Sequence, residues 1–245
     1  MGALSFFENR TKKALDQTMN SLLNNLAAIV LLAFSSISVS AANACDEASP
    51  SKPVSIHCGD APSASFDKNG RLWLAFVQDQ TVYVSHSDDL GKTYSSAVAV
   101  NPVREDAEHN GENRPKIIVD GDSTVFVSWT KKTSPRFTGE IRFSRSIDGG
   151  KTFSAPRTIN DDGLFAGHRF ESLYLTESGH LYLTWIDKRD LQASIERGED
   201  YAGAATYYAV STDQGASFST NYRVANNSCE CCRIAIAPHG SENIA

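Results

Sequence analysis

The feature that most constrains this sequence is an eight-residue motif that occurs three times, at residues 87–94, 146–153 and 211–218. The copies share the form Ser-x-Asp-x-Gly-x-Thr/Ser-aromatic, and their aspartates lie 59 and 65 residues apart. A repeat of this period indicates supersecondary units that stack, because one unit cannot bury its apolar face alone. The serines, aspartates and glycines of this repeat motif are Ser87, Asp89, Gly91, Ser146, Asp148, Gly150, Ser211, Asp213 and Gly215.

Stretches typical of β-strands surround each copy of the repeat motif. Alternating runs rich in β-branched and aromatic residues lie directly before the copies, at 81–85, 140–144 and 206–210. A further strand and a turn lie upstream of each run, and the strands are 72–77, 125–129 and 181–185. Innermost strands such as 116–119 precede these turns, and fourth strands such as 222–225 follow the motif. Four strands in each repeat predict the blades of a β-propeller.

The repeat motif itself is best interpreted as a structural clasp between the third and fourth strands of a blade. Its aspartate can accept hydrogen bonds from the backbone of its own turn, and its glycine permits a left-handed backbone. The final aromatic residue can pack between sheets. A calcium site needs more oxygen ligands at alternate positions than this turn supplies.

The motif resembles the Asp-box, or BNR repeat, of the sialidase superfamily, and the resemblance covers residue 58 to the end. It implies an all-β, sialidase-like β-propeller with a six-bladed parent, of which about three and a half four-stranded blades are present. We expect blades at 58–103, 114–160 and 169–226 and the start of a fourth at 232–245, after an N-terminal segment at 45–57. The chain would then be the N-terminal part of a larger propeller and inactive by itself.

Residues 1–44 are typical of a secretory signal peptide. Three basic residues precede an apolar run at 26–34, and small residues allow cleavage after Ala41 or Ala44. The run is too short for a stable membrane span, so we expect export to the periplasm or beyond. An alternative is a lipoprotein acylated at Cys45. The formal net charge of −6 argues against nucleic acid and anionic membranes as partners.

Alignment of the blades on their innermost strands places Arg114, Arg169 and Arg233 in register. Innermost strands line a propeller axis, and guanidinium groups hold carboxylates bidentately, so these arginines predict an anion site. The sialidase superfamily uses an arginine triad for the carboxylate of sialic acid, so the resemblance implies a carbohydrate or glycoconjugate ligand. This chain departs from the family by taking its arginines from consecutive blades and by lacking a Phe/Tyr-Arg-Ile-Pro motif. The alternative is that each arginine pairs with an acid of a neighbouring blade.

Hydrolysis of a glycoside requires a general acid together with a nucleophile or base, usually carboxylates. The acids that lie near the arginines by position are Asp106, Glu108, Glu112 and Glu171. No motif distinguishes any of them from solvated loop acids.

Four cysteines form the most distinctive local feature: Cys229, Cys231 and Cys232 lie directly before Arg233, and Cys58 occupies the matching position of the first blade. In an exported protein, Cys58 could pair with one of the three, or Cys229 with Cys232. Alternatively, the three thiols bind a soft metal such as copper or zinc, or remain free. No other cofactor is expected.

Two functions are compatible with these features. The first is an exported, sialidase-like exo-glycosidase that acts on acidic sugars through an arginine-lined axial pocket. The second is a non-catalytic propeller that serves in binding or assembly, with a disulfide or metal site at the cysteines.

Overall fold

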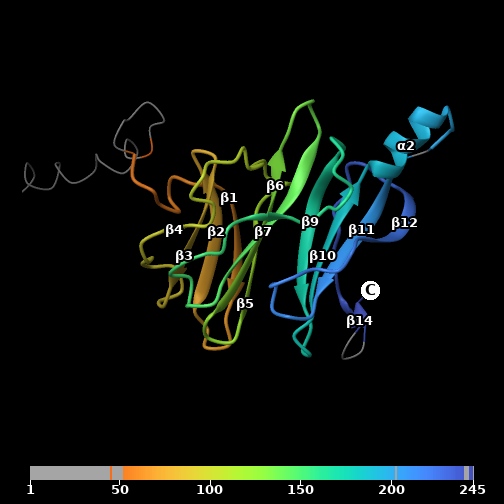
Figure 1. The fold of residues 1–245 in the computed structure, drawn as a ribbon. Helices are drawn as coiled ribbons and strands as arrows, with labels where there is room; N and C mark the ends of the chain where they lie inside the picture. The colour runs from red at the N-terminus through yellow and green to blue at the C-terminus, as the bar shows by residue number, and fades with distance from the viewer. Residues whose placement is uncertain (1–44, 46–51, 202, 240–242, 245) are drawn as a thin grey trace, which may run out of the picture. The chain divides into compact units, whose positions relative to one another are not determined.

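The computed structural model describes residues 45, 52–201, 203–239 and 243–244, and the predicted signal peptide lies outside them. The chain divides into two units, 1–52 and 53–245, and the strands found in the described residues all lie in the second. This second unit is built from three antiparallel four-stranded sheets (Figure 1). The predicted all-β, propeller-type fold class is therefore confirmed.

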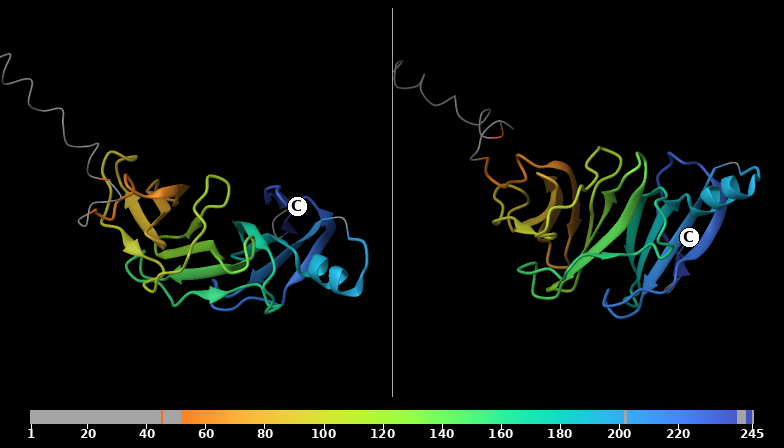
Figure 2. Two further views of the ribbon diagram at one scale, coloured as in Figure 1. Left: turned by 90° about the horizontal axis from the view of Figure 1, so that it is seen from above. Right: turned by 45° about the horizontal axis from the view of Figure 1, so that its top comes forward.

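Each sheet runs from an innermost to an outermost strand in chain order. The first contains β1 (Asp60–Phe66), β2 (Leu72–Gln78), β3 (Thr81–Ser87) and β4 (Val98–Ala99). The second contains β5 (Lys116–Asp120), β6 (Thr124–Lys132), β7 (Gly139–Ser146) and β8 (Arg157–Thr158). The third contains β9 (His168–Leu175), β10 (Leu181–Asp187), β11 (Ala204–Ser211) and β12 (Tyr222–Ser228). The innermost strands β1, β5 and β9 lie beside one another, and the sheets follow in sequence order along an arc (Figure 2).

The hydrophobic core lies between successive sheets, in two layers. Strand β6 of the middle sheet contributes apolar side chains to both layers of the core. Its residues Val125, Val127 and Trp129 pack toward the first sheet, whereas Phe126 packs toward the third. Because successive side chains of a strand point to opposite faces, a continuous apolar run is what this position requires.

The repeat motif forms the same hydrogen-bonded turn in all three sheets. In the second, the Asp148 carboxylate accepts the backbone N–H of Thr152 at 2.9 Å and the Ser146 hydroxyl at 2.7 Å. The Ser146 oxygen in turn accepts the N–H of Gly150 at 2.9 Å. The hydrogen bonds to the half-buried Asp148 carboxylate lower its pKa, with the Thr152 hydroxyl contributing most.

The turn also joins each blade to the one before it. A Cβ added to Gly150 would lie 2.7 Å from Trp73 of the first sheet, and one added to Gly215 would lie 2.7 Å from Phe143 of the second. Arg145 of the second sheet donates to the carbonyl oxygen of Gln214 at 2.6 Å. The clasp is therefore an inter-blade contact as well as a local turn.

Two segments depart from the pattern of four-stranded blades. The segment between β10 and β11 forms a helix, α2 (Arg189–Arg197), which packs against β11 (Figure 1). Residues 233–237, expected as the innermost strand of a fourth blade, form no strand, because no described segment pairs with them. The short strands β13 (Pro238–His239) and β14 (Asn243–Ile244) pair only with each other. In the described ranges, no helix is long and apolar enough to cross a membrane.

Candidate functional site

A cluster of charged side chains collects where the innermost strands begin. We define this axial cluster as Glu108, Glu112, Arg114, Lys116, Arg169, Glu171 and Arg233. Lys116 begins β5 and Arg114 lies two residues before it. Arg169 and Glu171 lie in β9, and the two other glutamates in the loop from β4 to β5. Residues remote in sequence therefore meet at one end of the strands.

Two of the three predicted arginines are paired with glutamates. Arg169 holds Glu108 bidentately, with its Nη2 2.9 Å from Oε1 and its Nε 3.1 Å from Oε2. Arg233 forms an ion pair with Glu112. These pairs connect separate blades, as the alternative interpretation of the arginines anticipates.

Arg114 differs from the other two arginines, because no carboxylate of the described residues pairs with it. Its guanidinium donates only to backbone carbonyl oxygens, those of Gly111 and Pro62. Lys116 donates to the carbonyl oxygen of Arg114 at 2.8 Å, and burial lowers its pKa. The axial cluster thus contains more cationic groups than paired carboxylates.

A β-bulge in β9 places the central residues of the cluster. Between the pairs Thr184–Ser172 and Ile186–Arg169, both Phe170 and Glu171 lie opposite a single residue of β10. Phe170 takes a positive φ of 61°, which is rare for a bulky side chain. Its ring lies 4.8 Å from the Arg169 guanidinium and 3.8 Å from that of Arg233. A β-bulge redirects the side chains of its strand, and this one places the Phe170 ring in contact with the guanidinium groups of Arg169 and Arg233.

Glu171 is the one fully buried acid of the axial cluster. Its Oε2 accepts a hydrogen bond from Thr130 at 2.9 Å, but its Oε1 has no partner among the described residues. Burial raises the pKa of this carboxyl, even though Lys116 and Thr130 act in the opposite direction. Glu171 therefore tends to keep a proton where an exposed glutamate loses it.

The four predicted acids are not all brought together. Glu108, Glu112 and Glu171 belong to the axial cluster, whereas Asp106 pairs with Lys132 at 2.8 Å. Asn113 and Thr130 lie between Glu108 and Glu171. Asn113 donates to Glu108, and the single hydroxyl proton of Thr130 has two alternative acceptors, Glu171 Oε2 at 2.9 Å and Asn113 Oδ1 at 3.3 Å. Sequence reasoning missed Lys116, although it follows Arg114 at the same spacing at which Glu171 follows Arg169.

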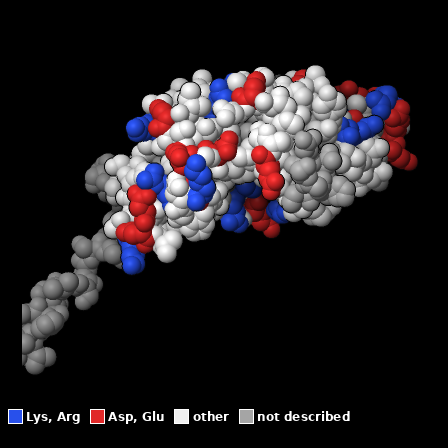
Figure 3. Space-filling model, turned by 90° about the horizontal axis from the view of Figure 1, so that it is seen from below, with Lys and Arg blue, Asp and Glu red and all other residues white. Residues whose placement is uncertain are grey.

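A cavity of about 220 Å³ opens beside Arg169. Phe137, Phe170 and Ile186 supply apolar walls, and Lys188 adds a second cation. Cys231 also lines it, so the cavity connects the arginines to the cysteines. On the face viewed in Figure 3, acidic and basic side chains are interspersed rather than gathered by sign.

The cysteines do not form the expected bridge. Cys58 is disulfide-bonded, whereas Cys229, Cys231 and Cys232 are free and exposed, so neither Cys58 to this group nor Cys229 to Cys232 is a disulfide. Cys45 is also disulfide-bonded, which leaves no thiol there for acylation. Hydrogen bonds, first from the Cys232 thiol and then from the Cys231 backbone, lower the pKa of Cys229 to about 7.

His168 lies in a second cluster of polar side chains in the interior. The sequence pattern had not singled out this histidine. Its Nδ1 lies 2.7 Å from the Gly139 carbonyl oxygen and its Nε2 2.9 Å from Asp162. Burial alone would lower the pKa of His168, but the hydrogen bond to Asp162 and the charge of Asp187 raise it. Arg189 pairs with Asp187 at 2.9 Å, so this group anchors α2.

No protein-family model matches the chain, and no curated protein sequence matches it. Solved structures that resemble it include an α-L-arabinofuranosidase from Fusarium graminearum with an iminosugar inhibitor (TM-score 0.46, 18% identity, 69% of this chain and 50% of that chain). Others are a Hadza microbial sialidase (TM-score 0.45, 18% identity, 66% and 37%) and a Penicillium chrysogenum α-L-arabinanase complexed with arabinobiose (TM-score 0.47, 16% identity, 67% and 49%). The chain spans half or less of the length of these proteins.

Proposed function

We propose that this chain supplies part of an acidic-sugar site in an exported, sialidase-like Asp-box propeller. The observation that carries the proposal is Arg114, an arginine in the axial cluster whose guanidinium has only backbone carbonyl partners among the described residues. A ligand carboxylate is the partner that such a group lacks. Arg169 of the same cluster and Phe170 line a cavity, which offers a cation and an aromatic ring for the body of a sugar.

Hydrolysis is the finer proposal, with Glu171 as the general acid. Such an acid must remain protonated near neutral pH, and burial raises the pKa of Glu171 in that direction. Glu108 supports the assignment as a second carboxylate, with Asn113 and Thr130 between it and Glu171. Oε1 of Glu171 is enclosed, so this role requires that sugar binding opens access to the carboxyl.

The binding proposal is tested with glucuronic acid and glucose, which differ by one carboxylate, and with N-acetylneuraminic acid. We expect Arg114→Gln to weaken binding of both acidic sugars by about 10–100-fold, as loss of a charge-assisted hydrogen bond of about 1.5–3 kcal/mol implies. Arg223→Gln is the matched control, because Arg223 lies on the outermost strand β12. Equal losses for glucose and glucuronic acid, or no preference for the acidic sugars, would contradict the proposal.

Hydrolysis is measured separately, in the whole propeller of which this chain is proposed to form part, as release of a fluorescent group from a sialoside. We expect Glu171→Gln to reduce the rate by about 10²–10⁴-fold while sugar binding persists, because a general acid contributes roughly that factor. An unchanged rate would exclude Glu171 as the acid and leave the binding proposal in place.

A further inference from the structure

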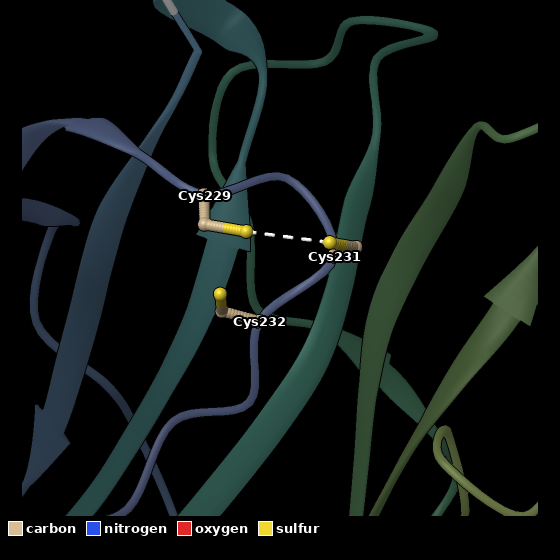
Figure 4. Close-up of side chains that lie close together, drawn as sticks. All are labelled: Cys229, Cys231 and Cys232. Carbon is tan, nitrogen blue, oxygen red and sulfur yellow. Dashed lines mark hydrogen bonds between the residues drawn. The ribbon is translucent and has the colours of Figure 1, made fainter.

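The segment Cys229-Glu230-Cys231-Cys232 follows β12 and folds its three thiols onto one another. The backbone reverses there, with the N–H of Cys232 directed at the carbonyl oxygen of Cys229 at 3.5 Å. The Sγ atoms of Cys229 and Cys231 lie 3.3 Å apart, and all three Sγ atoms lie within 4.8 Å of one another. Figure 4 shows the three sulfurs turned toward a common point.

This spacing suits a bound metal better than a disulfide. A metal–sulfur bond of about 2.3 Å in a planar three-coordinate site sets the sulfurs roughly 4 Å apart, so the thiols need only small movements. A disulfide has an S–S bond of about 2.05 Å and would use two of the three sulfurs. Cys231 and Cys232 are also adjacent in sequence, where a bridge is strained.

The number of ligands discriminates between metals. No histidine, aspartate, glutamate or further cysteine of the described residues joins the three sulfurs as a fourth ligand. Structural zinc takes four protein ligands, whereas Cu(I) is a soft ion selected by thiolates. We propose that Cys229, Cys231 and Cys232 together bind one Cu(I) ion through three thiolates.

The surrounding charges favour such a complex. Three thiolates around a monovalent ion carry a net negative charge, which nearby cations stabilise. Arg233 donates to the carbonyl oxygen of Cys231, and Lys188 lies beside the cluster in an ion pair with Glu230. The ion would form part of the wall of the cavity beside Arg169, since Cys231 lines it.

The test is a titration of the reduced protein with Cu(I) in the absence of oxygen, against bicinchoninate as a competing chelator. We expect one Cu(I) per chain and three sulfur neighbours by X-ray absorption. Each single replacement, Cys229→Ser, Cys231→Ser or Cys232→Ser, removes one ligand of the ion. Loss of a residue that only hydrogen-bonds to a ligand weakens metal affinity roughly 10–100-fold, so we expect a larger loss of Cu(I) affinity here. Ser228→Ala is the matched control, because it alters the neighbouring residue and retains all three thiols.

Three results would overturn the inference. One is Zn²⁺ binding in preference to Cu(I) in a competition between the two metals. Another is a Cu(I) affinity that the serine replacements leave unchanged. The third is a protein that, once reduced, binds no Cu(I) while its air-oxidised form has lost two hydrogens by mass and retains one of the three thiols. Far-UV circular dichroism compares the fold of each variant with that of the original chain.

Discussion

The glycine of the repeat motif has two separate requirements at one position. Gly150 has a φ of 75°, a left-handed backbone that side chains disfavour. Its Cα also lies against Trp73, where a Cβ would approach to 2.7 Å. The first requirement is local to the turn, whereas the second belongs to the contact between blades.

Replacement of Gly150 by alanine separates these requirements. We expect Gly150→Ala to lower the free energy of unfolding by about 1–2 kcal/mol for backbone strain and about 1–3 kcal/mol more for overpacking against Trp73. Gly179→Ala is the control, since Gly179 has a φ of 83° with no atom within 4 Å of its Cβ. Urea unfolding curves of the two variants measure the difference, and equal losses would show that the Trp73 contact contributes nothing.

Sequence alignment of the blades singled out three arginines, but it did not predict their partners, and Arg233 lies in a segment that forms no strand. The loop from β4 to β5 supplies Glu108 to Arg169 and Glu112 to Arg233. A loop has no periodicity from which its path can be inferred, so these pairs follow only from the folded chain. For the same reason Arg114, the arginine without such a partner, could not be distinguished beforehand.

At the scale of elements, the β-bulge in β9 sets the directions of the side chains on the innermost strand of the third sheet. An unbroken ladder would alternate the side chains of Arg169, Phe170 and Glu171 between faces. The bulge instead places Phe170 and Glu171 opposite one residue, with Phe170 against two guanidinium groups and Glu171 in the interior. Nothing in the strand's alternation signals this extra residue.

Arg189, the first residue of α2, makes the most buried ion pairs of this helix. Arg189 is mostly buried and pairs with Asp187 at 2.9 Å and with Asp161 at 2.8 Å. Arg189→Ala leaves the buried Asp187 without its main cation, and we expect a loss of about 3–5 kcal/mol in unfolding free energy.

Arg197 at the other end of α2 provides the comparison, because its pair with Glu199 is exposed. We expect Arg197→Ala to cause no measurable loss of stability. Thermal and urea unfolding of both variants test the contrast, and a stable Arg189→Ala variant would show that α2 is held by other contacts.

For the whole molecule, the regular parts of the fold were predictable and the irregular parts were not. Three blades follow from the repeat motif and from strands whose apolar residues fit a two-sided core. The helix α2 lies in an insertion with no counterpart in the other blades. Residues 233–237 are apolar and alternating enough to suggest a strand, but a strand also requires a neighbour with which to pair.

Global stability should depend on pH through His168. Its pKa is raised by folding, so the stability it contributes is fully present below the unfolded pKa of about 6.5 and is lost as pH rises through the folded pKa. We therefore expect the melting temperature to fall as pH rises from about 6 toward 9, and His168→Gln to remove much of this fall. His180→Gln, at the turn before β10, is the control. A wild-type melting temperature that stays constant over this range would exclude the His168 linkage.

The inter-blade contact of the repeat motif gives the assembly a direction. The turn of the second blade docks on Trp73 of the first, and the turn of the third docks on Phe143 of the second. A ribosome releases the first blade before the second and the second before the third. Each blade is therefore synthesised after the blade that its turn contacts, so synthesis and assembly can proceed in the same order.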